Sequence, residues 1–316
     1  MTKGVFFYDK SVGFSGTRVS NGRHGKDLYD AYAAARDVFQ EVDEALSQSL
    51  SKIIFEGPME TLTQTQNAQP ALMAMSMAVV RVMQKELGIS LQGTFQFVAG
   101  HSLGEYSALC AAGALSVADT AKLLRRRGEA MARAGEKNPG AMAAIIGLSM
   151  DDVRQVVTEA GCFVANDNSI GQVVISGTQE TVEKACTIAS ARGAKRALVL
   201  PVSGAFHSPL MQEAADEMKA VLMAAPMQNP VIPVVSNISA TAQTDAAQIK
   251  ELLYEQITGS VRWTQSVQYM HGQGVDTLVE AGAGKVLTGL TKRIVPDMGA
   301  VSVNSVLTLE EFSKTV

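Results

Sequence analysis

Gly100-His101-Ser102-Leu103-Gly104 is the stretch of this chain that decides its fold. It fits the G-x-S-x-G pattern, in which a serine sits on a sharp turn between a strand and a helix. A β-prone run, 95–99, precedes it, and a helix of small residues, 105–114, follows it. Glycines on both sides let the backbone turn without a Cβ clash. The pattern therefore predicts an α/β protein with a nucleophilic serine at Ser102.

The composition is that of a globular protein with a large core. Of the 316 residues, 47% are hydrophobic and 18% are charged, which predicts two domains or one domain with an insertion. A net charge of −4 without a long basic run argues against nucleic acid as a partner. No apolar run is long enough for a membrane span and no signal peptide is evident, so we expect a cytoplasmic protein, by default a monomer. The three cysteines are expected as reduced thiols, and the four histidines show no metal-ligand spacing, so no metal or cofactor is expected.

The chain divides into a larger α/β part and an insert. Strands and helices alternate on both sides of the insert, which predicts a doubly wound, mainly parallel sheet in a core of the α/β-hydrolase type. Residues 138–202 follow the order β-α-β-β-α-β of a ferredoxin-like unit, with a turn expected at 166–169. We therefore expect a large subdomain from residues 1–137 and 203–316 and a small one from residues 138–202. Residues 25–50 are expected to form a long amphipathic helix, and residues 231–236 a buried strand.

A serine hydroxyl needs a base, and His207 is the best candidate. It lies in a loop, 202–209, after a predicted strand end, where catalytic groups collect in α/β folds. His101 is adjacent to Ser102, but on such a turn its side chain points away, so we expect it to pack or to hydrogen-bond. No acidic residue between Ser102 and His207 is placed to orient the histidine. This argues against an ordinary esterase and favours a dyad steered by a neutral group.

Arg125-Arg126-Arg127 lies in the helix that follows the serine helix. On a helical wheel Arg126 falls almost opposite the apolar stripe, whereas Arg127 falls only about 60° from Leu124. A guanidinium on the buried edge needs an anion. That anion is either a structural carboxylate or a free carboxylate on the substrate, and both interpretations stay open.

Two other motifs have a functional and a plain interpretation. Gln69 comes just before a proline that opens a helix, where it either lines a site or serves as a cap. Gly282-Ala283-Gly284-Lys285 follows a strand and opens a helix, like a phosphate loop. It lacks the Walker spacing and the Ser/Thr, which argues against nucleotide hydrolysis.

Six segments together closely resemble the malonyl-CoA–acyl carrier protein transacylases, the acyltransferases of fatty-acid synthesis. They occur in colinear order between about Gly25 and Val295: GHSLGEYSAL, LLRRRGEAM, ANDNSIGQVVISG, SGAFHSPLM, SVRWTQSV and GAGKVLTGLTKRI. The resemblance implies transfer of a malonyl group from malonyl-CoA to the phosphopantetheine thiol of acyl carrier protein. The transfer would pass through a malonyl-serine intermediate and would need no metal or redox cofactor.

The resemblance also implies a role for each candidate residue. Ser102 would be the acylated nucleophile and His207 the general base, oriented by a backbone carbonyl near Gln256. Arg127 would hold the malonyl carboxylate. The pocket around the malonyl group would be lined by Gln69, His101 and Phe206, and the context of Phe206 resembles that of malonyl-selective members.

The chain departs from the family at one of the two expected oxyanion donors. The N–H of Leu103 points from a helix N-terminus toward an oxyanion at Ser102. The family's second donor is the first Gln of a Phe-Pro-Gly-Gln-Gly-Ser-Gln loop, but this chain differs over Phe14–His24 and has Thr17 at the place of that Gln. One allowed codon choice for this stretch, read one base later, spells the family motif and rejoins the expected frame at Gly25. We therefore hypothesise a compensated frameshift; if the chain is made as written, we expect a folded but impaired enzyme.

Three alternatives stay open. A serine hydrolase of the α/β-hydrolase or patatin type would use water as the acceptor and would not need Arg127. A binding protein disabled by its altered first loop would hold malonyl-CoA or carrier protein without turnover. A polyketide acyltransferase acting in trans is a close cousin that these residues do not distinguish.

Overall fold

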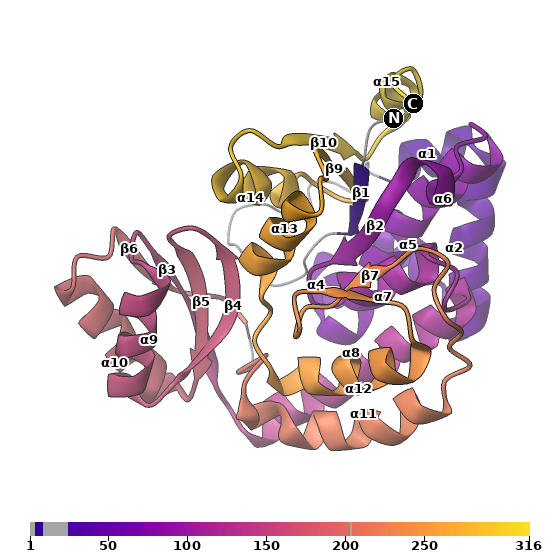
Figure 1. The fold of residues 1–316 in the computed structure, drawn as a ribbon. Helices are drawn as coiled ribbons and strands as arrows, with labels where there is room; N and C mark the ends of the chain where they lie inside the picture. Colours follow the sequence, from indigo (N-terminus) through magenta and orange to yellow (C-terminus); the bar gives the residue numbers. More distant parts are fainter. Residues whose placement is uncertain (1–3, 9–24, 203) are drawn as a thin grey trace.

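The computed structural model describes residues 4–8, 25–202 and 204–316. Over these residues the chain adopts a mixed α/β fold with a six-stranded sheet and a four-stranded sheet (Figure 1). The four-stranded sheet and its helices stand to one side of the larger, helix-flanked sheet, at the left of Figure 1.

The larger sheet has the strand order β10-β9-β1-β2-β7-β8, and every pairing in it is parallel except that of β7 with β8. Its strands are β1 (Gly4–Tyr8), β2 (Phe95–Gly100), β7 (Val234–Val235), β8 (Ala242–Gln243), β9 (Thr277–Ala281) and β10 (Gly299–Val303). β2 is almost continuously buried, as expected for a strand that is covered on both faces. Ser102 follows its carboxyl end, so the candidate site lies at that edge of the sheet.

Helices pack against both faces of this sheet. Val98 and Val279 belong to a large core with the helices of one face, whereas Phe97 and Leu278 belong to a separate core on the other face. The helices of the first core include α2 (Ala33–Leu46), α5 (Thr65–Lys85), α7 (Gly104–Ala111), α8 (Val117–Lys137), α11 (Gln212–Ala224) and α12 (Ala246–Thr258). Those of the second are α13 (Trp263–Gly272) and α14 (Val286–Ile294).

Shorter helices complete the larger part. They are α1 (Lys26–Ala31), α3 (Leu50–Glu56), α4 (Met59–Thr63), α6 (Leu91–Thr94), the 3₁₀ turn η1 (Pro209–Met211) and α15 (Val306–Ser313). The helix expected over 25–50 is therefore interrupted. Tyr32 adopts an extended conformation between α1 and α2, and Ser47 ends α2 with a left-handed backbone.

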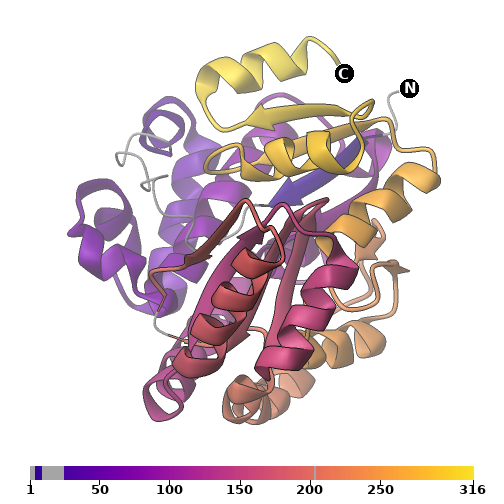
Figure 2. The same cartoon turned by 90° about the vertical axis from the view of Figure 1, so that its left-hand side faces the viewer.

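The smaller sheet is antiparallel, with the order β4-β5-β3-β6. Its strands are β3 (Ala141–Ile146), β4 (Phe163–Ser169), β5 (Gln172–Gly177) and β6 (Arg196–Val199). Two helices, α9 (Met150–Ala160) and α10 (Gln179–Ala191), cover one face, in front of the sheet in Figure 2. The other face is turned toward the larger part of the protein.

Two local expectations about strands are wrong. The turn expected at 166–169 is the second half of β4, which pairs with β5 and, through an isolated bridge at Asn166, with Val261 of the larger part. Val261 N–H donates to Ala165 O at 2.9 Å and Asp167 N–H donates to Val261 O at 2.9 Å. This tertiary pairing overrides the turn preference of Asn and Asp. The strand expected at 231–236 is only Val234–Val235.

Gly128 lets α8 approach the start of α5 closely. A Cβ at this position would lie 2.5 Å from Gln66 Cα and 2.7 Å from Thr65 O. Backbone atoms cannot move aside as a flexible side chain can, so only glycine fits here. The close approach brings Arg127 of α8 next to Gln69 of α5.

We expect Gly128→Ala to destabilise the protein by about 1–3 kcal/mol, because the added methyl group overpacks the contact between α5 and α8. Chemical unfolding measures this change. Gly289→Ala is the matched control, since Gly289 also lies in a helix but has no atom within 4 Å of the added Cβ. There we expect a gain of about 0.5–1 kcal/mol from helix propensity. Equal stability of Gly128→Ala and the parent protein would contradict the close contact.

Candidate active site

Ser102 lies on a tight elbow between β2 and α7. Its backbone is left-handed, with φ of 56°, which is unusual for a residue other than glycine. A Cβ at Gly100 would overlap the backbone of Gly104, so the turn requires glycine there. Asn237 holds the elbow from outside: its Oδ1 accepts from Ser102 N–H at 2.7 Å, and its Nδ2 donates to Gly100 O at 2.7 Å. The strand, elbow and helix expected around Ser102 are therefore present.

His207 lies beside the serine. Its Nε2 is 2.8 Å from Ser102 Oγ, and its Nδ1 is 2.8 Å from the backbone oxygen of Gln256. Because that carbonyl can only accept, Nδ1 carries the proton and the lone pair of Nε2 faces the serine hydroxyl. Gln256 is in the last turn of α12, where carbonyls lack helical partners and the helix dipole is negative. A neutral group thus orients the histidine.

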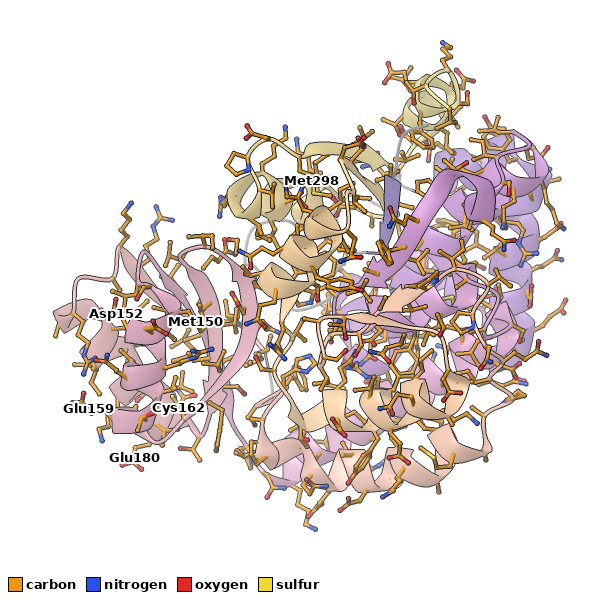
Figure 3. The ribbon with its side chains drawn as sticks, in the orientation of Figure 1. Met150, Asp152, Glu159, Cys162, Glu180 and Met298 are labelled. Atoms are coloured by element: carbon orange, nitrogen blue, oxygen red, sulfur yellow. The ribbon has the colours of Figure 1, made fainter. Side chains whose placement is uncertain are left out.

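The acidic side chains of the smaller part do not take the place of the Gln256 carbonyl next to His207 Nδ1. Asp152 and Glu159 lie on α9 and Glu180 lies on α10, on the outer side of the smaller sheet (Figure 3). Asp167 is closer, but its carboxylate accepts from Thr264 Oγ1 at 2.6 Å. The expectation of a dyad without an orienting acid agrees with this arrangement.

Arg127 points into the same site. One of its terminal nitrogens, Nη1, donates to Gln69 Oε1 at 2.8 Å, and the other, Nη2, donates to Gln256 Oε1 at 2.9 Å and to Ser102 Oγ at 3.2 Å. The side chain is only 1% exposed, and burial lowers the pKa of Arg127 below its ordinary value. Among the described residues, no carboxylate forms an ion pair with it. A buried cation with neutral partners is suited to receive an anion.

The neighbouring arginines differ, as the helical wheel predicts. The side chain of Arg126 is 63% exposed and lies 4.0 Å from Glu129. Arg125 is half-buried and donates to Gln48 Oε1 on the far side of α8. Of the three, only Arg127 contacts the site.

Glu105 is a buried acid that sequence reasoning missed. Its Oε2 accepts from Gln256 Nε2 at 2.6 Å and from the Asn237 N–H at 3.1 Å. Burial raises the pKa of Glu105 to about 7, although these hydrogen bonds and the charge of Arg127 act in the opposite direction. From sequence alone an acid in the first turn of a helix is explained by the helix dipole, and its contacts with Asn237 and Gln256 are too distant in sequence to infer.

The other candidates surround this centre or lie outside the described residues. His101 Nε2 is 2.8 Å from Asn168 Oδ1 of β4, so its side chain hydrogen-bonds to the smaller sheet. Phe206 is buried in the large core, next to His207. Leu103 is the N-cap residue of α7. Thr17 and the rest of the altered stretch 14–24 lie outside the described residues.

In the segment that resembles a phosphate loop, 282–285, a protein carboxylate caps the helix that follows. Glu280 at the end of β9 accepts from the backbone N–H groups of Leu287 at 3.0 Å and Thr288 at 2.8 Å. Its carboxylate also accepts from Thr288 Oγ1 at 2.6 Å. The N-terminus of α14 is therefore already occupied by a protein carboxylate.

Two findings concern metals and membranes. Within the ranges 4–8, 25–202 and 204–316, no group of three or more His, Cys, Asp or Glu side chains is placed to hold a metal ion. No helix in the same ranges has the length and apolar character that a membrane crossing requires. The three cysteines are all unpaired.

Comparison with known proteins gives consistent matches. The acyl transferase domain family model matches residues 22–308. A malonyl CoA-acyl carrier protein transacylase of Bacillus subtilis is 48% identical over 291 residues, which cover 90% of this chain and 90% of that protein. The crystal structure of an acyl-carrier-protein-S-malonyltransferase from Bartonella henselae, 48% identical, superposes with a TM-score of 0.93 and covers 100% of this chain and 99% of its own.

A further solved structure contains a carrier protein. It is a malonyl-transacylase in complex with its type II PKS acyl-carrier protein, 38% identical, with a TM-score of 0.91 and coverage of 99% of both chains. Both the family model and the relatives span most of the sequence, at identities well above those that show a fold alone. The chain therefore belongs to the acyl transferase family, among the malonyl CoA-acyl carrier protein transacylases.

Proposed function

We propose that this protein transfers the malonyl group of malonyl-CoA to the phosphopantetheine thiol of acyl carrier protein, through a malonyl ester on Ser102. One observation carries the proposal: the imidazole of His207 and the guanidinium of Arg127 both lie within hydrogen-bond distance of the Ser102 hydroxyl. Ser102 Oγ lies 2.8 Å from His207 Nε2 and 3.2 Å from a terminal nitrogen of Arg127. The names of the relatives, with their high identity, support the same activity.

The dyad supplies the chemistry of both half-reactions. His207 takes the Ser102 proton as Oγ attacks the thioester carbonyl, and the imidazolium then protonates the departing thiolate of coenzyme A. In the second half His207 takes the proton of the carrier thiol, whose sulfur attacks the malonyl ester. The proton returns to Ser102 Oγ as it leaves. The Gln256 carbonyl stabilises the imidazolium formed in each half.

Two backbone groups are proposed to hold the oxyanion. The Leu103 N–H lies at the start of α7, where free amides and the helix dipole favour negative charge. Thr17 stands at the place of the family's Gln, and we propose that its backbone N–H, in the altered loop, is an impaired second donor.

Arg127 is proposed to bind the free carboxylate of the malonyl group. A guanidinium can pair with a carboxylate through two parallel hydrogen bonds, and the attraction is strong in a site from which water is excluded. Gln69 fixes one of its nitrogens, and we propose that His101 and Phe206 complete the walls of the acyl pocket. A hydrolase of neutral esters has no use for this buried charge next to its nucleophile.

We also propose the finer organisation of the fold. The strand order β4-β5-β3-β6 with two helices on one face supports a ferredoxin-like subdomain at 138–202. Helix-packed cores on both faces of the larger sheet support a doubly wound sheet of the α/β-hydrolase type, formed by residues 1–137 and 203–316. The three unpaired cysteines suit a reducing compartment, so we propose a cytoplasmic location.

The malonyl ester is tested by intact-protein mass spectrometry after mixing with malonyl-CoA. We expect a gain of one malonyl group, and no gain for Ser102→Ala, because the acyl acceptor is lost. Ser107→Ala is the matched control, a buried serine in α7, the helix that follows the elbow, and should still gain the group. A protein that gains nothing would contradict the proposed function and favour the non-catalytic alternative.

Removal of the guanidinium tests acyl selectivity. For Arg127→Ala we expect kcat/KM with malonyl-CoA to fall by about 10²-fold or more, since loss of one partner of a buried charged pair costs about 2–5 kcal/mol. Acetyl-CoA, which lacks the carboxylate, should be affected far less. Arg126→Ala, at the exposed neighbouring position, should stay close to the parent protein. Unchanged malonyl transfer in Arg127→Ala, with turnover of neutral esters, would favour a serine hydrolase.

The altered stretch 14–24 gives a third prediction. Replacing it with the family loop should raise the malonyl-transfer rate by about 10²–10³-fold, the cost of one missing oxyanion donor. Sequencing the coding DNA tests the frameshift separately, because codons that do not spell the family motif one base later would end that hypothesis. Equal rates with and without the family loop would show that Thr17 serves as well as the Gln.

A further inference from the structure

Two buried residues with amide side chains, Gln256 and Asn237, hold the three functional groups of the site. Gln256 accepts from His207 through its backbone oxygen at 2.8 Å and from Arg127 through Oε1 at 2.9 Å. Asn237 holds the backbone of Ser102 through its Oδ1 at 2.7 Å. Both amides are fully buried. The serine, the histidine and the arginine therefore depend on how Gln256 and Asn237 are placed.

A single carboxylate connects these two amides. Glu105 Oε2 accepts from Gln256 Nε2 at 2.6 Å and from the backbone N–H of Asn237 at 3.1 Å. Glu105 is 2% exposed and touches none of the reacting atoms. Within the described part of the chain it has no ion-pair partner at 4 Å or less.

An acid at this place is costly for the fold. Burial without a directly paired cation disfavours its charged form, which is why the pKa of Glu105 is raised. A packing role would be served at lower cost by an apolar side chain of similar volume. The charge needs an explanation beyond packing.

The explanation lies in the direction of the Gln256 amide. Arg127 can only donate hydrogen bonds and a carboxylate can only accept them. Of the residues that the structure describes, three present acceptors to Gln256 Nε2: Glu105 Oε2 at 2.6 Å, Ser102 O at 3.1 Å and Asn237 Oδ1 at 3.3 Å. Glu105 is the nearest of them and the only ionisable one, and with this acceptor in place the amide Oε1 is turned toward Arg127. A donor at 105 favours the reverse, which turns the amide NH₂ group toward the guanidinium and removes one of its acceptors.

We propose that Glu105 is a positioning residue that sets the direction of the Gln256 amide and thereby orients Arg127 for the malonyl carboxylate. The proposal rests on the proposed function and adds a residue to it. The charged form of Glu105 also opposes the loss of the proton from Arg127. Glu105 thus acts on acyl selectivity through Gln256.

Glu105→Gln is the direct test, because it keeps the size of the side chain but removes its charge and replaces one of its two acceptor oxygens with a donor. We expect KM for malonyl-CoA to rise by about 10-fold or more, since misplacement of a positioning group costs about 10–10²-fold. The ratio of malonyl to acetyl loading of Ser102, measured by mass spectrometry with equal malonyl-CoA and acetyl-CoA, should fall by a similar factor. Glu280→Gln is the matched control: an equally buried carboxylate that caps α14 and should leave this ratio unchanged.

The route through Gln256 is tested by combining variants. In a Gln256→Ala background, which keeps the backbone carbonyl for His207, Glu105→Gln should no longer change the loading ratio. If Glu105→Gln does not fold, Glu105→Asp and Glu105→Asn replace it. These two side chains have equal size, but Asp has two acceptor oxygens whereas Asn has one oxygen and one donor nitrogen. The Asp variant should then retain the higher ratio.

Each outcome has one meaning. An unchanged loading ratio in Glu105→Gln, or equal ratios in the Asp and Asn variants, would overturn the positioning role. An effect of Glu105→Gln on the loading ratio that persists in full in the Gln256→Ala background would also overturn the positioning role. These results leave the proposed function intact as long as the parent protein loads malonyl in an Arg127-dependent way. Failure of the parent protein itself to load malonyl contradicts the proposed function instead.

Discussion

The hydrogen bond between Ser102 Oγ and His207 Nε2, 2.8 Å long, joins residues 105 positions apart in the chain. Both residues have a left-handed backbone with φ of 56°, a conformation that persists only where its surroundings enforce it. For Ser102 the surroundings are the end of β2, the glycines of the elbow and the amide of Asn237. For His207 they include the end of α12, whose free carbonyl holds the ring. The elbow after β2 and the end of α12 therefore have to be packed together before this bond can form.

The electrostatic design of the site follows from its burial. Arg127 is 1% exposed and its hydrogen-bond partners are neutral, which suits the proposed binding of the malonyl carboxylate. The histidine is steered by a carbonyl, which adds no net charge next to the nucleophile. Glu105 supplies a negative charge one amide away from the guanidinium. The site is thus prepared for an acidic acyl group and keeps its own acid at a distance from the reacting atoms.

Local sequence signals predicted the parts of this site that depend on local structure. The glycine spacing predicted the elbow, and helical periodicity separated buried Arg127 from exposed Arg126. The loop after a strand end pointed to His207, while the place of Gln256 came from the family resemblance. Glu105 and Asn237 were missed because their roles arise from contacts across more than 100 positions. The wrong turn at 166–169 has a similar origin, since pairing with β5 and with Val261 overrides the local turn preference of that segment.

The most direct test of the central claim is a crystal structure of the protein trapped after reaction with malonyl-CoA in the absence of carrier protein. The account predicts an ester on Ser102 Oγ, with His207 Nε2 beside it and both oxygens of the malonyl carboxylate on the Arg127 guanidinium. An acyl group on another side chain, or a malonyl carboxylate directed away from Arg127 into solvent, would contradict it.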